Sequence, residues 1–66
     1  MKDPLKDKIV RIISKANEPL ETKEVLGQTN GTRVTLLYRL HNLRGEGKLR
    51  GKHIGSGKGT WIWWKA

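Results

Sequence analysis

The 66-residue chain contains no cysteine, no phenylalanine and only two prolines. The absence of cysteine excludes a disulfide framework and a thiolate zinc site, so aliphatic packing and the three tryptophans must stabilise the fold. A domain of this length buries only about 60% of the surface of its unfolded chain, so its core is small. No apolar run approaches the ~20 residues of a membrane span, and no signal-peptide pattern opens the chain. We therefore expect one intracellular domain, residues 1–66, without membrane contact.

Acidic residues are scarce in the second half of the chain, and the formal net charge is +8. Residues 1–31 contain six Lys or Arg and five Asp or Glu, a balance of +1. Residues 32–66 contain eight Lys or Arg against the single acid Glu46, a balance of +7. Solubility alone does not require such segregation, which is typical of a surface that binds a polyanion.

Arrangements of catalytic or metal-binding residues are also missing. Five of the six acids precede Gly27, and the only histidines are His41 and His53. These residues form no paired-carboxylate, Ser/His/Asp or metal-ligand pattern. The segment Gly55–Thr60 resembles the phosphate-binding loop of nucleotide kinases, but that motif requires a glycine in place of Lys52 and a helix after its lysine. We therefore expect no enzyme activity, no metal, no cofactor and no small-molecule substrate.

The first half of the chain predicts two helices. Asp3 and Pro4 favour a helix start, since the first is a capping residue and the second suits the first helical position. An apolar face then recurs at helical spacing, at Leu5, Ile9, Ile12, Ile13 and Ala16. This pattern predicts a helix over residues 4–16, which Pro19 ends because the residue before proline avoids the α region. Leu20 is expected to be extended and buried, and a short helix over residues 22–27 follows.

The second half predicts a turn, a third helix and a β-hairpin. Residues 27–31 are rich in turn formers, and a helix is expected over residues 32–45. Its core face is formed by the leucines Leu36, Leu40 and Leu43, and its opposite side by Thr35, Tyr38, Arg39 and Asn42. The hairpin is expected over residues 48–65, with a glycine-rich tip.

The last predicted strand contains all three tryptophans. Side chains alternate along a strand, so Trp61 and Trp63 share one face while Ile62 and Trp64 share the other. One of the two faces must close the core of so small a domain. The alternation alone does not decide which.

This order of elements, together with the motif Leu40-x-x-Leu43-x-x-x-Gly47-Lys48-Leu49, resembles the winged helix-turn-helix family over about residues 5–64. The resemblance implies an α+β fold, a three-helix bundle with a C-terminal β-hairpin wing. It also implies a recognition helix over residues 32–42 that enters the DNA major groove, and a wing over residues 52–58. Such a domain would bind double-stranded DNA as a small transcriptional regulator or chromatin-associated factor, cytoplasmic or nucleoid-associated.

The candidate contacts have the chemistry that DNA requires. Thr32 and Arg33 begin the third helix, where free N–H groups suit a phosphate. Arginine can pair with guanine, asparagine with adenine, and a threonine methyl with thymine. On the hairpin, alternating basic residues project from one face, though lysines on a strand also discourage aggregation. The predicted DNA-binding residues are Thr32, Arg33, Thr35, Tyr38, Arg39, Asn42, Arg50, Lys52 and Lys58.

Two other functions fit the same residues. A protein-interaction module would use the tryptophan strand and the third helix to bind an acidic partner. An RNA-binding or ribonucleoprotein role would use the same basic surface. The sequence predicts no oligomeric state, since no segment reads as a dimerisation helix.

Overall fold

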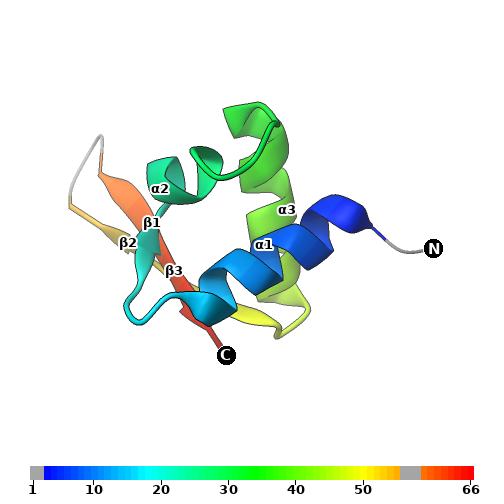
Figure 1. The fold of residues 1–66 in the computed structure, drawn as a ribbon. Coiled ribbons are helices and arrows are strands. Elements are labelled where there is room, and N and C mark those ends of the chain that lie inside the picture. The colour runs from blue at the N-terminus through cyan, green and yellow to red at the C-terminus, as the bar shows by residue number, and fades with distance from the viewer. Residues whose placement is uncertain (1–2, 56–58) are drawn as a thin grey trace.

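The computed structural model describes residues 3–55 and 59–66, which form a small α+β domain. Three helices precede a C-terminal antiparallel hairpin, an order consistent with a winged-helix topology (Figure 1). The bounds of the three helices lie within one residue of the ranges expected from the sequence, and the two strands of the hairpin fall within the expected residues 48–65. The elements are α1 (Pro4–Lys15), β1 (Leu20–Glu21), α2 (Thr22–Leu26), α3 (Arg33–Gly45), β2 (Leu49–Ile54) and β3 (Thr60–Lys65).

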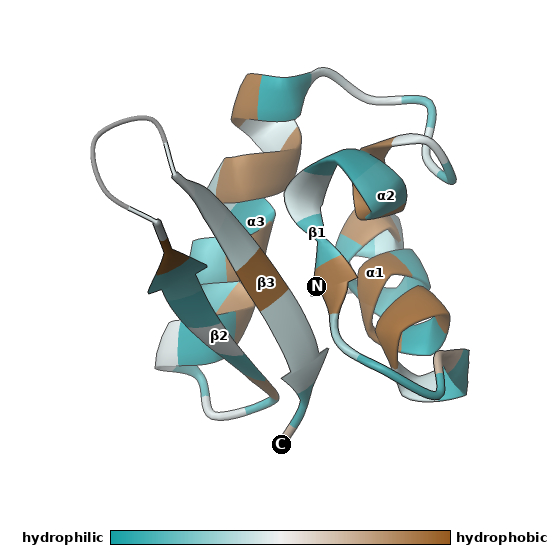
Figure 2. Cartoon of the chain, turned by 90° about the vertical axis from the view of Figure 1, so that its left-hand side faces the viewer, coloured by the Kyte–Doolittle hydropathy of each residue, from teal (hydrophilic) through white to brown (hydrophobic). Residues whose placement is uncertain are grey.

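The three strands form one antiparallel sheet in the order β1-β3-β2. The central strand β3 pairs with the short β1 through Leu20 opposite Trp63 and Glu21 opposite Ile62. In Figure 2 the sheet covers one side of the helices, with α3 beside the hairpin and α1 at the opposite end. The edge strand β2 therefore borders α3. The extended conformation of Leu20 was expected, but a two-residue strand is too short to show a period that predicts its pairing.

Local signals set the helix ends. The Asp3 carboxylate accepts hydrogen bonds from the backbone N–H groups of Leu5 and Lys6, at 3.1 and 3.2 Å, and so caps α1. At the end of α3, Gly47 adopts φ 79°, and the N–H of Lys48 donates to the Leu43 carbonyl at 3.0 Å. This Schellman turn satisfies the last carbonyls of α3 and directs the chain into β2.

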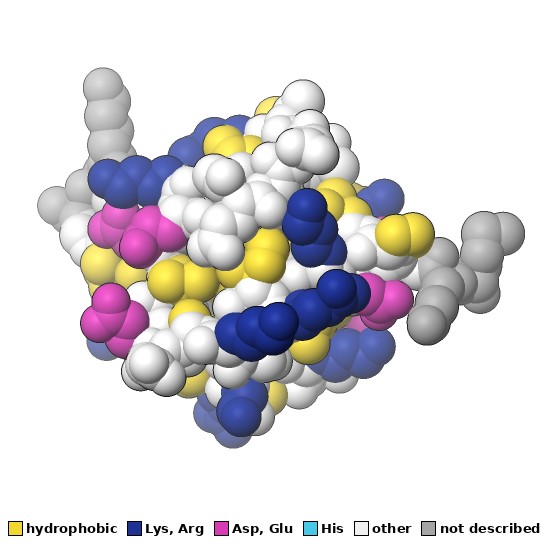
Figure 3. Space-filling view, viewed as in Figure 1, with side chains coloured by type: hydrophobic (Ala, Val, Ile, Leu, Met, Phe, Trp, Pro, Cys, Tyr) yellow, Lys and Arg dark blue, Asp and Glu magenta, His cyan; other side chains and the backbone are white. Residues whose placement is uncertain are grey.

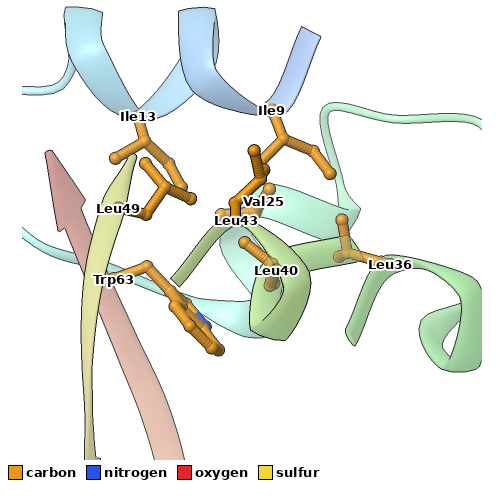
Figure 4. Packing of buried hydrophobic residues seen from close by; sticks show 8 residues of the cluster. All are labelled: Ile9, Ile13, Val25, Leu36, Leu40, Leu43, Leu49 and Trp63. Atoms are coloured by element: carbon orange, nitrogen blue, oxygen red, sulfur yellow. The ribbon is translucent and has the colours of Figure 1, made fainter. Parts of the chain in front are cut away.

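Among the described residues, the core contains eight buried apolar side chains that come from all three helices and from the hairpin (Figure 4). They are Ile9, Ile13, Val25, Leu36, Leu40, Leu43, Leu49 and Trp63. Trp63 is fully buried, so the face shared by Trp61 and Trp63 is the one that closes the core. Ile62 and Trp64 lie on the outer face of the sheet and are half-buried.

Trp63 is fixed by two neighbours. Its indole Nε1–H donates to Oγ1 of the buried Thr22 at 2.9 Å, which satisfies the only polar atom of the side chain. Gly51 lies directly opposite Trp63 in the hairpin. A Cβ atom at position 51 would lie 2.6 Å from two ring carbons of Trp63 and 3.3 Å from Trp61. Only glycine leaves room for the two indoles at this position.

We expect Gly51→Ala to destabilise the domain by about 1–3 kcal/mol, because the added methyl group overlaps a side chain that the core holds in place. Urea unfolding followed by tryptophan fluorescence measures the change. Gly45→Ala is the matched control, since nothing lies within 4 Å of its Cβ position in α3. It should leave stability unchanged or raise it by up to about 1 kcal/mol. Equal unfolding midpoints for Gly51→Ala and the unmodified protein would contradict the proposed overlap.

Thr22 provides a second test of the core. Thr22→Val leaves the Trp63 N–H without its acceptor in a buried site, which should cost about 1–3 kcal/mol of unfolding free energy. Thr22→Ser keeps the hydroxyl and removes one methyl, so it should cost about 0.8 kcal/mol. The same urea titration compares the two variants. A valine variant at least as stable as the serine variant would show that this hydrogen bond adds no net stability.

Candidate nucleic-acid interface

The first turns of α3 present an exposed surface. Thr32 caps the helix by accepting from the Thr35 N–H at 3.3 Å, and the two hydroxyls also bond to each other at 3.1 Å. Arg33 and Thr35 are exposed. Val34 and Tyr38, one turn apart, are 79% and 62% exposed, so neither covers the core. This part of α3 therefore offers two hydroxyls, a cation, an apolar side chain and a phenol to a partner.

Arg39 leaves this surface and turns toward α1. Its Nε lies 2.9 Å from Oδ2 of Asp3, and only 30% of the side chain is exposed. The contact is between charges, since the buried Nε–H has no aligned hydrogen-bond partner in the described residues. The guanidinium carbon remains 5.4 Å from the centroid of the Tyr38 ring. Asn42, one turn further on, is half-buried. A base contact by Arg39 would thus require it to leave Asp3.

The basic residues of the hairpin lie on a different surface from the exposed face of α3. Arg50 lies opposite Trp64 and Lys52 opposite Ile62, so both cations project from the outer face of the sheet. They are exposed and share a face, as the alternation predicts, at the edge strand next to α3. Lys58 lies outside the described residues.

A cationic and aromatic cluster that was not predicted from the sequence lies between α3 and the hairpin. We define the Trp61 cluster as Trp61, His41, Arg44 and His53. The ring centroids of His41 and His53 lie 4.9 and 5.9 Å from that of Trp61, both nearly edge-on. The Arg44 guanidinium carbon lies 5.2 Å from the same ring. His41 and Arg44 lie three residues apart on α3, and this spacing, visible in the sequence, places both on one side of the helix. Their common partner Trp61 can be identified only when the pairing of the hairpin strands is known.

A cleft of about 390 Å³ opens next to this cluster. Arg44 of α3 and Arg50 of β2 both line it. No acidic side chain lines it. Its other lining residues are Gly47, Leu49, Gly51, Trp64 and Ala66. The cleft therefore has the charge and the size to accept an anionic group such as a phosphate.

Ion pairing leaves α3 and the hairpin positively charged. Glu46, the only acid after Glu24, forms ion pairs with Lys6 and Lys48. A hydrogen bond from Lys6, together with the charges of Lys6 and Lys48, holds the pKa of Glu46 below its ordinary value. Within residues 3–55 and 59–66, no carboxylate pairs with the cations Arg33, Arg44, Arg50, Lys52 and Lys65.

A second basic surface lies on α1. Figure 3 shows Lys and Arg side chains in a row along this helix. The exposed residues Lys8, Arg11 and Lys15 recur at i, i+3 and i+7 and so share one side of α1. This side points away from the core and is separate from the exposed face of α3.

No protein-family model, curated protein or solved structure matches this chain. In the described part of the chain, no helix has the length and apolar character needed to cross a bilayer. Over the same residues, no three His, Asp or Glu side chains come together as metal ligands. Function must therefore be inferred from the residues and their arrangement.

The Asp3 side chain has two roles, as the cap of α1 and as the partner of Arg39, and two variants separate these roles. Asp3→Ala removes both the cap of α1 and the Arg39 contact, and should lower the unfolding free energy by about 1 kcal/mol. Asp3→Asn keeps a capping oxygen and removes only the charge, so we expect a loss of about 0.5 kcal/mol or less for this half-exposed pair. Thermal unfolding by circular dichroism in low and in about 1 M salt distinguishes them, since salt screens only the ion pair. If the two variants lose the same stability at both salt concentrations, the assigned division is wrong.

Proposed function

We propose that this domain binds duplex DNA as a winged helix-turn-helix module, as a small transcriptional regulator or chromatin-associated factor. The observation that carries the proposal is the complete absence of acidic residues from α3 and from the β2–β3 hairpin. Glu46, which lies between them, is held by two lysines. A polyanion can approach this side of the molecule without meeting an unpaired carboxylate in the described residues.

The exposed face of α3 fits the major groove. In helix-turn-helix proteins, residues near the start of the recognition helix contact base edges. Thr35 and Val34 offer methyl groups suited to thymine, while Arg33 and the free N–H groups at the helix start suit a phosphate. Arg50 and Lys52 project from the outer face of the edge strand beside α3, and their charges suit phosphates of the neighbouring backbone.

Duplex DNA is favoured over duplex RNA by the shape of the groove. The A-form major groove of RNA is deep and narrow, and side chains cannot read it. The B-form major groove admits an α-helix. A domain whose exposed contact residues lie on a helix is therefore better suited to B-form DNA.

One observation favours a second candidate, recognition of an acidic peptide. Ile62 and Trp64 are half-buried on the outer face of the sheet, directly opposite Lys52 and Arg50. Beside them lies a cleft of about 530 Å³ between the end of α1 and β3. Apolar side chains flanked by cations suit a peptide with both acidic and apolar residues. Glu18 also lines this cleft, which weakens its attraction for such a peptide.

The salt dependence of binding tests the DNA proposal. If about 4–6 phosphates are neutralised, log K should fall with log[salt] with a slope of about −4 to −5. Arg33→Gln should weaken binding and reduce the slope by about 1. Arg11→Gln is the matched control, an exposed arginine of α1 on another side of the molecule, and should change neither. Fluorescence anisotropy of a labelled duplex measures both.

Amide NMR shifts locate the contact. Addition of a duplex should shift residues 32–42 and the hairpin, and an equal concentration of duplex RNA should compete poorly. A slope near zero, with shifts from an acidic peptide centred on Ile62 and Trp64, would replace the DNA proposal with the second candidate.

A further inference from the structure

The Trp61 cluster brings both histidines of the chain to one indole. His41 also lies edge-on to Trp63, with centroids 5.1 Å apart, and Trp61 stacks on Trp63 at 5.2 Å and an interplanar angle of 19°. His41, His53 and Arg44 are exposed, whereas Trp61 is half-buried. Three side chains that carry or can gain positive charge thus surround a ring that the core holds in place.

The surroundings of the two imidazoles contain cations and aromatic rings. Against His41, β3 presents the uncharged Trp61 and Trp63. On α3, Tyr38 precedes His41 by three residues and Arg44 follows by three. Against His53, β3 presents Trp61, its direct partner in the hairpin register. Along β2, Lys52 precedes His53 and projects from the other face. Neither α3 nor the two strands contain a carboxylate side chain.

We infer that the Trp61 cluster is a backbone-phosphate site for duplex DNA whose affinity increases as its histidines are protonated. The inference rests on the proposed function and deepens it, because it assigns three further contact residues, His41, Arg44 and His53, and makes binding dependent on pH. None of the three was among the contacts predicted from the sequence.

The chemistry follows from the charges. A neutral imidazole has one N–H donor, and an imidazolium, having taken a proton from solvent, has two. A phosphate placed among the three side chains accepts hydrogen bonds from their N–H groups, and its negative charge favours the protonated imidazoles. Proton uptake and phosphate binding therefore favour each other, and the coupling is reciprocal.

The aromatic rings arrange the site in advance. Cations are attracted to an indole face within about 6 Å of the ring centroid. Arg44, at 5.2 Å from the centroid of Trp61, lies inside that range, and the His41 and His53 rings pack against the same indole. Arg44 also lines the neighbouring cleft with Arg50, so the cationic surface continues from the cluster toward the edge of the sheet.

The decisive measurement is the Kd for a labelled duplex at about pH 8 and about pH 5.5, at a constant ionic strength of about 0.1 M. The chain has only two histidines, and imidazole is the side chain whose unperturbed charge changes in this range. At this salt concentration, one added phosphate contact with a slope of about 0.9 corresponds to roughly an eightfold gain in affinity. The unmodified protein should therefore bind about tenfold more tightly, or more, at the lower pH.

Variants assign the effect to the cluster. His41→Gln with His53→Gln should bring the ratio of the two Kd values to within about twofold of one. Tryptophan fluorescence would show whether the double variant unfolds. If it does, His53→Gln alone should reduce the logarithm of the ratio of the two Kd values by about half. Arg11→Gln should leave the ratio unchanged. Arg44→Gln should weaken binding at both pH values.

The outcomes separate the two proposals. A ratio near one for the unmodified protein, or a full ratio retained by the histidine variants, overturns the phosphate site at the Trp61 cluster and leaves DNA binding intact. Absence of binding at both pH values overturns the proposed function as well.

Discussion

The burial of Trp63 is the interaction on which the rest of the structure depends. Its indole lies over Gly51 of β2, and its N–H donates to Thr22 at the start of α2. One side chain thus links β3 to both a neighbouring strand and a helix. Because side chains alternate along a strand, placing Trp63 inward also places Trp61 beside α3 and directs Ile62 outward. The burial of Trp63 therefore determines which side chains of the hairpin face outward.

The burial of Trp63 also determines where the basic residues of the hairpin lie. With Trp63 inward, the hairpin register directs Arg50 and Lys52 to the outer face, while His53 stays with Trp61. The acids are concentrated in the first 24 residues, and the one later acid, Glu46, is held by lysines at the end of α3. The side formed by α3 and the hairpin is consequently cationic for two independent reasons, its composition and its ion pairing.

The parts of this fold that could be predicted are those set by local signals. Asp3 and Pro4 mark the start of α1, and the leucine spacing marks the core face of α3. The inward face of β3 could not be predicted, because both faces carry two large apolar residues. Gly51 favours the face with Trp63, because only glycine leaves room for its ring. That a glycine lies opposite this tryptophan can be recognised only when the register of the hairpin is known. The helical period places Arg39 away from the core face of α3. Its long side chain nevertheless reaches Asp3, the residue that caps α1.

Trp61 connects the core to the surface that we propose for binding. It stacks on the buried Trp63 with ring centroids 5.2 Å apart, so its position is fixed by packing rather than by solvent-exposed contacts. The side chains of His41, Arg44 and His53 are in turn placed against its ring. A domain without disulfides and with a small core can thereby hold flexible charged side chains in a defined arrangement, since their common neighbour belongs to the core. Preorganisation of this kind reduces the entropy lost when a partner binds.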